Sequence, residues 1–254
     1  MGRFEDRNAI VFGGTSGINL EIATRLAAEG ARIFLVSRSQ EKVDSAVSRI
    51  RSSGYSAAGH AADVRDYEAV DAAVKAAAEE GAIDIVVSGA AGNFLAPAAD
   101  ISSNAFRTVI DIDLVGTFNT ARASFAAMRK PGASFIAISA PQAEKPMTSQ
   151  AHACAAKAGI NMLVKCLALE WGEQGIRVNA ISPGPIDDTE GMRRLAGSDA
   201  AAQAIADALP LKRYGTKQDV ADAACFLASQ EGAYITGTIL NVDGGTSLGT
   251  GRLV

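Results

Sequence analysis

The chain is poor in the residues that build metal centres and disulfide frameworks. Its 254 residues include only three cysteines and two histidines, and these do not have the spacing of metal ligands. We therefore expect neither a metal site nor a set of disulfides. Cys154 and Cys166 fall within one helical run, so they are most simply small, reduced core residues.

An excess of positive charge is also missing. The formal net charge is −4, which gives no general attraction to nucleic acid or to an anionic membrane surface. No apolar run is long enough to cross a bilayer. The charged first residues pass directly into an apolar strand, unlike a signal peptide, and the final GRLV does not match a peroxisomal address. We expect a cytoplasmic protein with no nucleic-acid or membrane partner.

What the chain does have is a regular alternation of short apolar runs and alanine-rich amphipathic segments. This alternation predicts a parallel sheet with helices on both faces, a doubly wound Rossmann-type α/β fold. Strands are expected at about 9–12, 33–36, 56–62, 83–87, 134–139, 177–182 and 238–242, and a long helix at about 104–128. We expect one domain over residues 1–254, with a candidate substrate lid at about 187–212.

A glycine-rich turn, FGGTSGIN at residues 12–19, separates the first strand from the first helix. Glycines at such a turn let the backbone approach a pyrophosphate, which the helix N-terminus then stabilises. The alternative is a turn that binds nothing. The candidate contacts are Gly13, Thr15, Ser16, Gly17 and Ile18.

The end of the second strand indicates which dinucleotide would bind. NAD-binding sheets usually place an acidic residue there for the ribose hydroxyls, but this chain has Ser37 and Arg38. Arg38 is available for a 2′-phosphate, so NADPH is predicted as the cofactor. The alternative is a solvated arginine at a helix start.

A single ammonium falls within the apolar stripe of the helix that begins in residues 149–160. The stripe consists of Ala153, Lys157, Ile160, Val164 and Leu167. Burying one charge alone is very costly, so Lys157 needs a partner.

Helical spacing places a matching carboxylate on the preceding long helix. The repeating positions are Phe106, Ile110, Asp113 and Thr117. Asp113 should therefore project from an apolar face. An Asp113–Lys157 pair is either a structural ion pair or part of a catalytic centre.

Several segments, in matching order, resemble the short-chain dehydrogenase/reductase family over nearly the whole chain. The turn at 12–19 resembles its T-G-x-x-x-G-I-G loop, with Phe12 for the threonine and Asn19 for the last glycine. RVNAISPGPI at 177–186 resembles the nicotinamide-side loop, and ITGTILNVDGG at 235–245 the terminal strand. The resemblance implies cofactor contacts at Asp63, Val64, Gly89, Ala90, Ala91, Lys157, Pro183, Gly184, Pro185, Ile186 and Thr189. For Asp63, a plain polar strand end is the alternative.

The family's Asn-Ser-Tyr-Lys tetrad is retained only at Lys157. Its tyrosine position is Ala153, its serine position Ala140 (next to Ser139) and its asparagine position Asp113. Ordinary carbonyl reduction, in which the tyrosine protonates an alkoxide, is therefore not available.

One branch of the family has this altered set. SGAAGNF at 88–94 resembles the NNAAGNF signature of 2,4-dienoyl-CoA reductases, and IDIDLVGTFNTAR at 110–122 resembles their IDIDxxGTFN segment. HACAAKAG at 152–159 and PGPIDDTEGMRRL at 183–195 resemble HAGSAKAA and PGPIxxTEGxxRL of the peroxisomal type. That branch reduces the conjugated diene of a fatty acyl-CoA with NADPH. The resemblance implies an Asp113–Lys157 catalytic pair and an oligomer, usually a tetramer.

The implied chemistry is hydride transfer to the δ-carbon, with charge moving to the thioester oxygen as a dienolate. That oxygen needs donors and a positive field. Lys157 would hold the nicotinamide ribose, and Asp113 would orient a water that protonates carbon. Asn93 either donates to the thioester carbonyl or is a turn residue, and Phe94 either lines the acyl channel or packs in the core. Arg193 either meets CoA phosphates or is solvated.

Two other functions remain open. The chain could be another carbonyl or enoyl-thioester reductase with unusual proton delivery, or a non-catalytic NADPH-binding protein. His152 lies one residue before Ala153. An imidazole can titrate near neutrality, but a neighbouring helical position faces elsewhere, so His152 is interpreted as non-catalytic.

Overall fold

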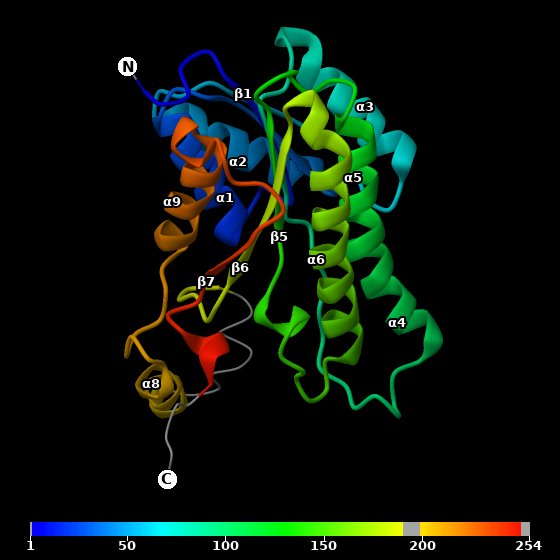
Figure 1. Ribbon diagram of the computed structural model, residues 1–254, viewed down its shortest axis with the longest axis vertical. Coiled ribbons are helices and arrows are strands. Elements are labelled where there is room, and N and C mark those ends of the chain that lie inside the picture. The colour runs from blue at the N-terminus through cyan, green and yellow to red at the C-terminus, as the bar shows by residue number, and fades with distance from the viewer. Residues whose placement is uncertain (1, 190–198, 250–254) are drawn as a thin grey trace.

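The sheet has seven parallel strands in the order β3-β2-β1-β4-β5-β6-β7 (Figure 1). The computed structural model describes residues 2–189 and 199–249. The strands are β1 (Asn8–Phe12), β2 (Arg32–Ser37), β3 (Ala57–Ala61), β4 (Ile85–Ser88), β5 (Ser134–Ile138), β6 (Arg177–Pro183) and β7 (Ile239–Val242). The expected doubly wound α/β fold is confirmed, with every expected strand within a few residues of its place.

Helices cover both faces of the sheet (Figure 1). They are α1 (Gly17–Ala28), α2 (Gln40–Ser52), α3 (Tyr67–Ala77), α4 (Ser103–Ile110), α5 (Gly116–Ser124), α6 (Ala151–Trp171), α8 (Asp199–Ala208) and α9 (Lys217–Ala228). One apolar core lies between the sheet and α1, α2 and α9, and a second lies between the sheet and α3, α5 and α6. Burial on both faces explains why β1 is apolar almost throughout and all five of its residues are buried.

The long helix expected at 104–128 is interrupted. Between α4 and α5 the chain makes a π-helical turn, η2 (Asp111–Val115), and the helix ends at Ser124. A π turn adds one residue to the helical repeat, so positions before and after it do not keep one phase. Phe106 is accordingly exposed whereas Asp113 is buried. The regular spacing inferred from sequence was wrong in this respect, although it assigned Asp113 to the buried face.

A cluster of charges closes the amino-terminal edge of the sheet. The carboxylate of Asp84, just before β4, accepts hydrogen bonds from Arg7, Arg129 and the backbone N–H of Asn8. These contacts join the start of β1, the start of β4 and the segment after α5.

Two further features concern residues 2–189 and 199–249 only. None of the helices found there combines the length and the apolar character that a bilayer-crossing helix needs. No group of three or more histidine, cysteine or acidic side chains is arranged there to hold a metal ion.

Candidate functional site

Asp113 and Lys157 meet at the carboxyl edge of the sheet. Their atoms Oδ2 and Nζ lie 3.2 Å apart, and the side chains are 1% and 10% exposed. Oδ1 of Asp113 accepts a 2.7 Å hydrogen bond from the N–H of Gly92, and Nζ of Lys157 donates a 3.0 Å bond to the carbonyl of Ile138. The ion pair therefore joins the loop after β4, the end of β5, the π turn and α6.

Lys157 keeps binding capacity in this arrangement. An ammonium group carries three N–H donors. Within the described parts of the chain it meets two acceptors, the Ile138 carbonyl and the Asp113 carboxylate. At least one N–H of Lys157 is therefore available for a ligand at the carboxyl end of β5.

The carboxylate of the ion pair comes from the π turn, because Asp113 lies within it. Thr117, one turn further on, donates its hydroxyl to the backbone carbonyl of Asp113 at 2.6 Å, and the Ser88 hydroxyl at the end of β4 lies 3.3 Å from that of Thr117. The Thr117 hydroxyl is thus a second donor to the Asp113 carbonyl, which also accepts from the backbone N–H of Gly116. Sequence inspection missed the turn, because nothing in IDIDLVG marks it.

The loop after β4 is attached to the start of α6 by successive contacts. Nδ2 of Asn93 donates to Oε1 of Gln150 at 2.8 Å, and the N–H of Ala96 donates to the carbonyl of Ser149 at 3.0 Å. The ring of Phe94 stacks on that of His152 with centroids 4.2 Å apart. Both substrate candidates in this loop, Asn93 and Phe94, are thereby brought beside the ion pair.

His152 is fully buried, and neither ring nitrogen has a hydrogen-bond partner among the described residues. Burial lowers the pKa of His152, and the charge of Asp113 opposes this only in part. The imidazole is therefore neutral at pH 7. Its place against Phe94 was not foreseen from the sequence.

The family's tyrosine and serine positions hold alanines in this chain, at Ala153 and Ala140. Ala153 is buried, and Ala140 precedes the short helix Pro141–Ala143. The neighbouring Ser139 is also buried, and its hydroxyl donates to Oδ1 of Asn161 at 2.5 Å. The two positions themselves are therefore apolar, and the neighbouring Ser139 hydroxyl is already bonded.

The glycine turn has the backbone of an anion site. Gly13 and Gly17 have φ values of 72° and 58°, which favour glycine. Ser16, at the N-cap of α1, makes no side-chain capping bond, and the first turn contains no acidic residue. Thr15 and Ile18 lie in the same turn, at the N-terminus of a helix, where negative charge is stabilised.

The ends of β2 and β3 gather the groups expected around the adenosine. Arg38 follows β2 and is exposed. Asp63 follows β3 and forms an ion pair with Arg65, with Oδ2 and Nη2 2.6 Å apart. The Arg65 hydrogen bond, aided by the nearby charge of Arg38, lowers the pKa of Asp63. Val64 is buried against Gly116 of α5. The role of Arg65 was missed from the sequence.

The remaining cofactor candidates also lie at the carboxyl edge. Gly89, Ala90 and Ala91 follow β4, and Pro183 ends β6. Gly184 has no room for a side chain, because a β-carbon there would lie 2.6 Å from Cα of Asp243.

The segment beyond Gly184 leads toward the candidate lid. Pro185 and the buried Ile186 follow directly, and the Thr189 hydroxyl donates to the Ile186 carbonyl at 2.7 Å. Arg193 and part of the candidate lid at 187–212 lie outside the described residues, which resume with α8.

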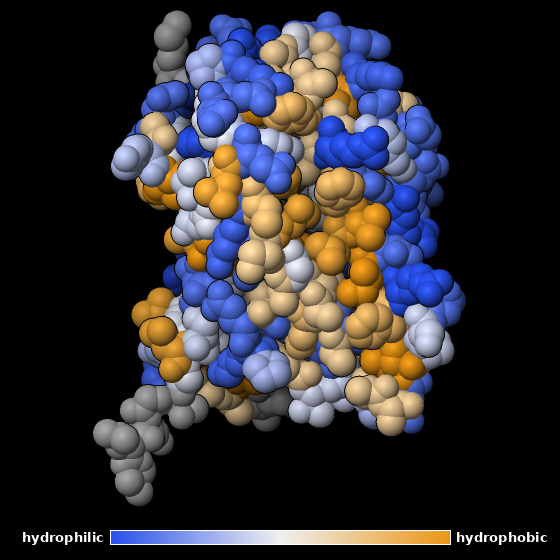
Figure 2. Space-filling model, turned by 45° about the vertical axis from the view of Figure 1, so that its right-hand side comes forward, coloured by the Kyte–Doolittle hydropathy of each residue, from blue (hydrophilic) through white to orange (hydrophobic). Residues whose placement is uncertain are grey.

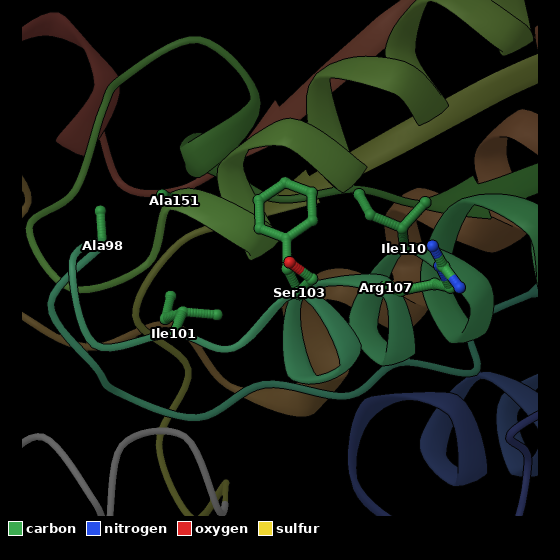
Figure 3. A pocket seen from close by; sticks show the side chains of 7 residues that line it. Ala98, Ile101, Ser103, Arg107, Ile110 and Ala151 are labelled. Carbon is green, nitrogen blue, oxygen red and sulfur yellow. The ribbon is translucent and has the colours of Figure 1, made fainter.

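An apolar cavity of about 530 Å³ lies between α4, the loop before it and the start of α6 (Figure 3). Its apolar wall is formed by Ala98, Ile101, Phe106, Ile110 and Ala151. Arg107 adds one positive charge to this wall. Ile110 comes one helical turn before Asp113, so the cavity adjoins the helices that carry the ion pair.

The parallel sheet, the glycine turn and the polar centre at the carboxyl edge define a nucleotide-dependent oxidoreductase of the Rossmann type. Residues 13–247 match the family model described as enoyl-(acyl carrier protein) reductase. The chain belongs to the short-chain dehydrogenase/reductase family and is an enzyme of that family.

Two relatives in sequence are similar to the chain over most of its length. The chain is 42% identical over 246 residues to the peroxisomal 2,4-dienoyl-CoA reductase [(3E)-enoyl-CoA-producing] of Danio rerio, covering 96% of this chain and 82% of that protein. It is 35% identical over 245 residues to the probable 2,4-dienoyl-CoA reductase [(2E)-enoyl-CoA-producing] of Bacillus subtilis, covering 95% and 96%.

A solved structure supports the fold and the type of cofactor. A gluconate 5-dehydrogenase from Burkholderia cenocepacia, in complex with NADP and tartrate, superposes with a TM-score of 0.91. It is 32% identical and covers 97% of this chain and 98% of its own. A nicotinamide cofactor is therefore indicated for this chain as well.

Proposed function

We propose that the chain is an NADPH-dependent 2,4-dienoyl-CoA reductase. The observation that carries the proposal is the buried Asp113–Lys157 pair, formed at the carboxyl edge while the tyrosine position holds Ala153. A carbonyl reductase needs an acid for an alkoxide. A conjugated thioester instead spreads its negative charge to the thioester oxygen, where a positive field is sufficient.

The bound cofactor supplies the hydride, and the protein supplies position and charge. Lys157 offers its remaining N–H to the nicotinamide ribose and places a positive charge near the dienolate. Asp113 is fixed by the N–H of Gly92 and orients the water that gives a proton to carbon. The hydroxide that this leaves takes a proton from solvent. Asn93 is oriented by Gln150 and donates to the thioester, and Phe94 and the cavity beside α4 give apolar surface for the acyl chain.

The carbon that receives the proton determines the product. After hydride addition at the δ-carbon, protonation at the α-carbon gives a 3-enoyl thioester, and protonation at the γ-carbon gives a 2-enoyl thioester. The higher identity to the (3E)-producing relative than to the (2E)-producing one leads us to propose the 3-enoyl product. In that case Asp113 directs its water to the α-carbon.

NADPH is the proposed cofactor because Arg38 stands where an acidic residue would select NADH. Arg38→Asp should shift the ratio of kcat/KM for NADPH over NADH toward NADH by about 10- to 100-fold, since a charge-assisted contact becomes a repulsion. An unchanged ratio would show that Arg38 does not contact the 2′-phosphate.

The direct test is NADPH oxidation with trans,trans-2,4-hexadienoyl-CoA, followed by identification of the enoyl-CoA isomer. We expect turnover and a 3-enoyl product. Measurable NADPH binding without turnover of any dienoyl chain length would refute the proposal and favour a non-catalytic binding protein. Turnover of only carbonyl or 2-enoyl thioesters would favour another reductase of the family.

We also propose that the enzyme is a homo-oligomer, a tetramer by resemblance to the family. Apolar side chains gather on the face formed by α5 and α6 (Figure 2). Those most exposed there are Val115, Phe118, Met162 and Leu169. Such a patch is typical of a subunit interface. Light scattering should give a tetramer, and Phe118→Glu with Met162→Glu should reduce its mass; a monomeric parent protein would contradict the proposal.

A further inference from the structure

Two glycine-rich segments depart from the patterns that they otherwise match, and the departures are reciprocal. The turn at 12–19 has Asn19 where T-G-x-x-x-G-I-G has a glycine, and the segment at 88–94 has Gly89 where NNAAGNF has an asparagine. The two positions are 70 residues apart in the chain, yet they are in contact in the structure.

The side chain of Asn19 fills the space that a side chain at position 89 would need. A β-carbon built on Gly89 would lie 2.2 Å from Oδ1 and 2.4 Å from Nδ2 of Asn19, much closer than non-bonded atoms approach. Gly89 is not among the glycines with positive φ. The space over Gly89 is therefore occupied by the end of the Asn19 side chain and not by backbone, and a larger residue at position 89 would force that amide to move.

The amide of Asn19 joins the two segments. Its Nδ2 donates to the carbonyl of Gly89 at 2.8 Å and to that of Gly13 at 3.3 Å. The backbones are already close, because a β-carbon on Gly13 would lie 2.9 Å from the nitrogen of Ala90. Without this shared donor, two carbonyl oxygens would face each other with no partner between them.

The orientation of the amide follows from its surroundings. Two acceptors converge on one atom, which must be the NH₂ group because a side-chain oxygen could not donate. Oδ1 is buried and has no hydrogen-bond partner among the described residues. The side chain is thus held by its donor group alone, and an aspartate of the same shape could not replace it.

We propose that Asn19 is a positioning residue for the dinucleotide cofactor. Its amide sets the distance between the turn that would receive the pyrophosphate and the end of β4 that would face the nicotinamide ribose. It does this from the position of a family glycine because Gly89 leaves the space open. The inference rests on the cofactor contacts proposed above for these two segments.

The test is an exchange of the two residues. The NADPH dissociation constant, from fluorescence titration, and the melting temperature without cofactor are measured for Asn19→Gly, Gly89→Asn and the double variant. Each single change should weaken NADPH binding about tenfold. Asn19→Gly loses two hydrogen bonds, and Gly89→Asn overlaps with the side chain of Asn19. The double variant moves the amide to position 89 and should bind NADPH within about threefold of the parent.

A matched control separates positioning from general stability. Asn8 lies at the other end of β1 from the glycine turn, is buried, and donates its amide to the Ala82 carbonyl at 3.2 Å. Asn8→Gly should lower the melting temperature and leave the NADPH affinity unchanged. An equal loss of affinity in Asn8→Gly would reduce the role of Asn19 to stability and overturn the proposal.

Other outcomes are equally decisive. A double variant that binds NADPH no better than the weaker single variant would overturn the proposal, as would an unchanged affinity in Asn19→Gly. If Gly89→Asn does not fold, Gly89→Ala replaces it. Gly89→Ala should lower the melting temperature of the protein that keeps Asn19. It should leave the melting temperature unchanged in the protein that carries Asn19→Gly. Correct behaviour of this series without dienoyl-CoA turnover would refute the proposed function and leave the positioning role intact.

Discussion

Two carboxylates are buried to almost the same extent at opposite edges of the sheet, but they are held in different ways. Asp84, 2% exposed, receives hydrogen bonds from two arginines whose side chains are 39% and 42% exposed. Asp113, 1% exposed, faces the ammonium of Lys157, which is itself only 10% exposed. The two arginines at Asp84 therefore stay in contact with water, whereas Lys157 at Asp113 is almost completely buried.

Under the function proposed above, this difference is the one expected between a structural and a catalytic ion pair. Arginine offers a planar set of donors that can satisfy a carboxylate completely, and both oxygens of Asp84 are used. Burying a lysine is costlier, because its compact charge loses more hydration. Lys157 pays that cost while keeping an N–H for a ligand, which a purely structural pair would not need.

The largest expected effect is on the Asp113–Lys157 pair. Asp113→Asn and Lys157→Met should each lower kcat with dienoyl-CoA by about 10²- to 10⁴-fold, because charge placement and proton delivery are lost. Steady-state kinetics at saturating NADPH provide the measurement.

The double variant shows whether the pair is only structural. Each single variant leaves a buried charge without its partner, which should destabilise the protein by about 3–5 kcal/mol. Asp113→Asn with Lys157→Met removes both charges and should recover much of that stability while remaining inactive. Near-normal activity in the double variant would mean that the pair has no catalytic role.

The second prediction concerns the other edge. Asp84→Asn should lower the free energy of unfolding by about 2–4 kcal/mol, because charge-assisted hydrogen bonds are lost while both arginines can turn to water. Its kcat at 25 °C should equal that of the parent, since the site lies at the far edge. Urea unfolding measures the stability of Asp84→Asn, and steady-state kinetics on the same preparation measure its kcat. A large loss of kcat would show that Asp84 affects the reaction and is not only structural.

The two edges also differ in how far the sequence could predict them. The alternation of apolar and amphipathic segments was sufficient for the sheet, since burial on both faces makes the central strands β1 and β4 almost continuously apolar. Helical spacing was sufficient to bring Asp113 and Lys157 onto facing surfaces. Those signals are local and periodic, and they survive in a single sequence.

Other features depend on contacts between distant segments and leave no local pattern. The π turn, Asp111–Val115, changes the helical phase without a glycine or proline inside it. Asp63 and Arg65 are two residues apart in sequence, but the position of this ion pair beside Arg38 depends on the pairing of β2 with β3. The fit of Asn19 into the space over Gly89 requires the packing of the glycine turn against β4.

A third prediction follows from the protonation of Asp84. Burial raises its pKa, but hydrogen bonds from Arg129, the Asn8 backbone and Arg7 outweigh burial, so its pKa lies below the usual value. A carboxyl group with a lowered folded-state pKa gives stability above its unfolded pKa, and this is lost as pH falls through the folded pKa. Between about pH 4 and pH 2, the melting temperature of the parent should fall more steeply than that of Asp84→Asn. Parallel curves would show that Asp84 is not the responsible group.

The smallest effect is expected at His152, a buried ionisable side chain beside the Asp113–Lys157 pair. It differs from both carboxylates because its ring is uncharged and has no hydrogen-bond partner in the described structure. His152→Phe keeps the stacking on Phe94 and removes two buried polar nitrogens, so the free energy of unfolding should change by less than about 1 kcal/mol. The kcat should stay within about threefold of the parent, with an unaltered pH profile between about pH 6 and 8. If the plot of kcat against pH loses its ascending or descending limb in His152→Phe, His152 is a proton donor. The proposed catalytic centre would then comprise three buried groups instead of two.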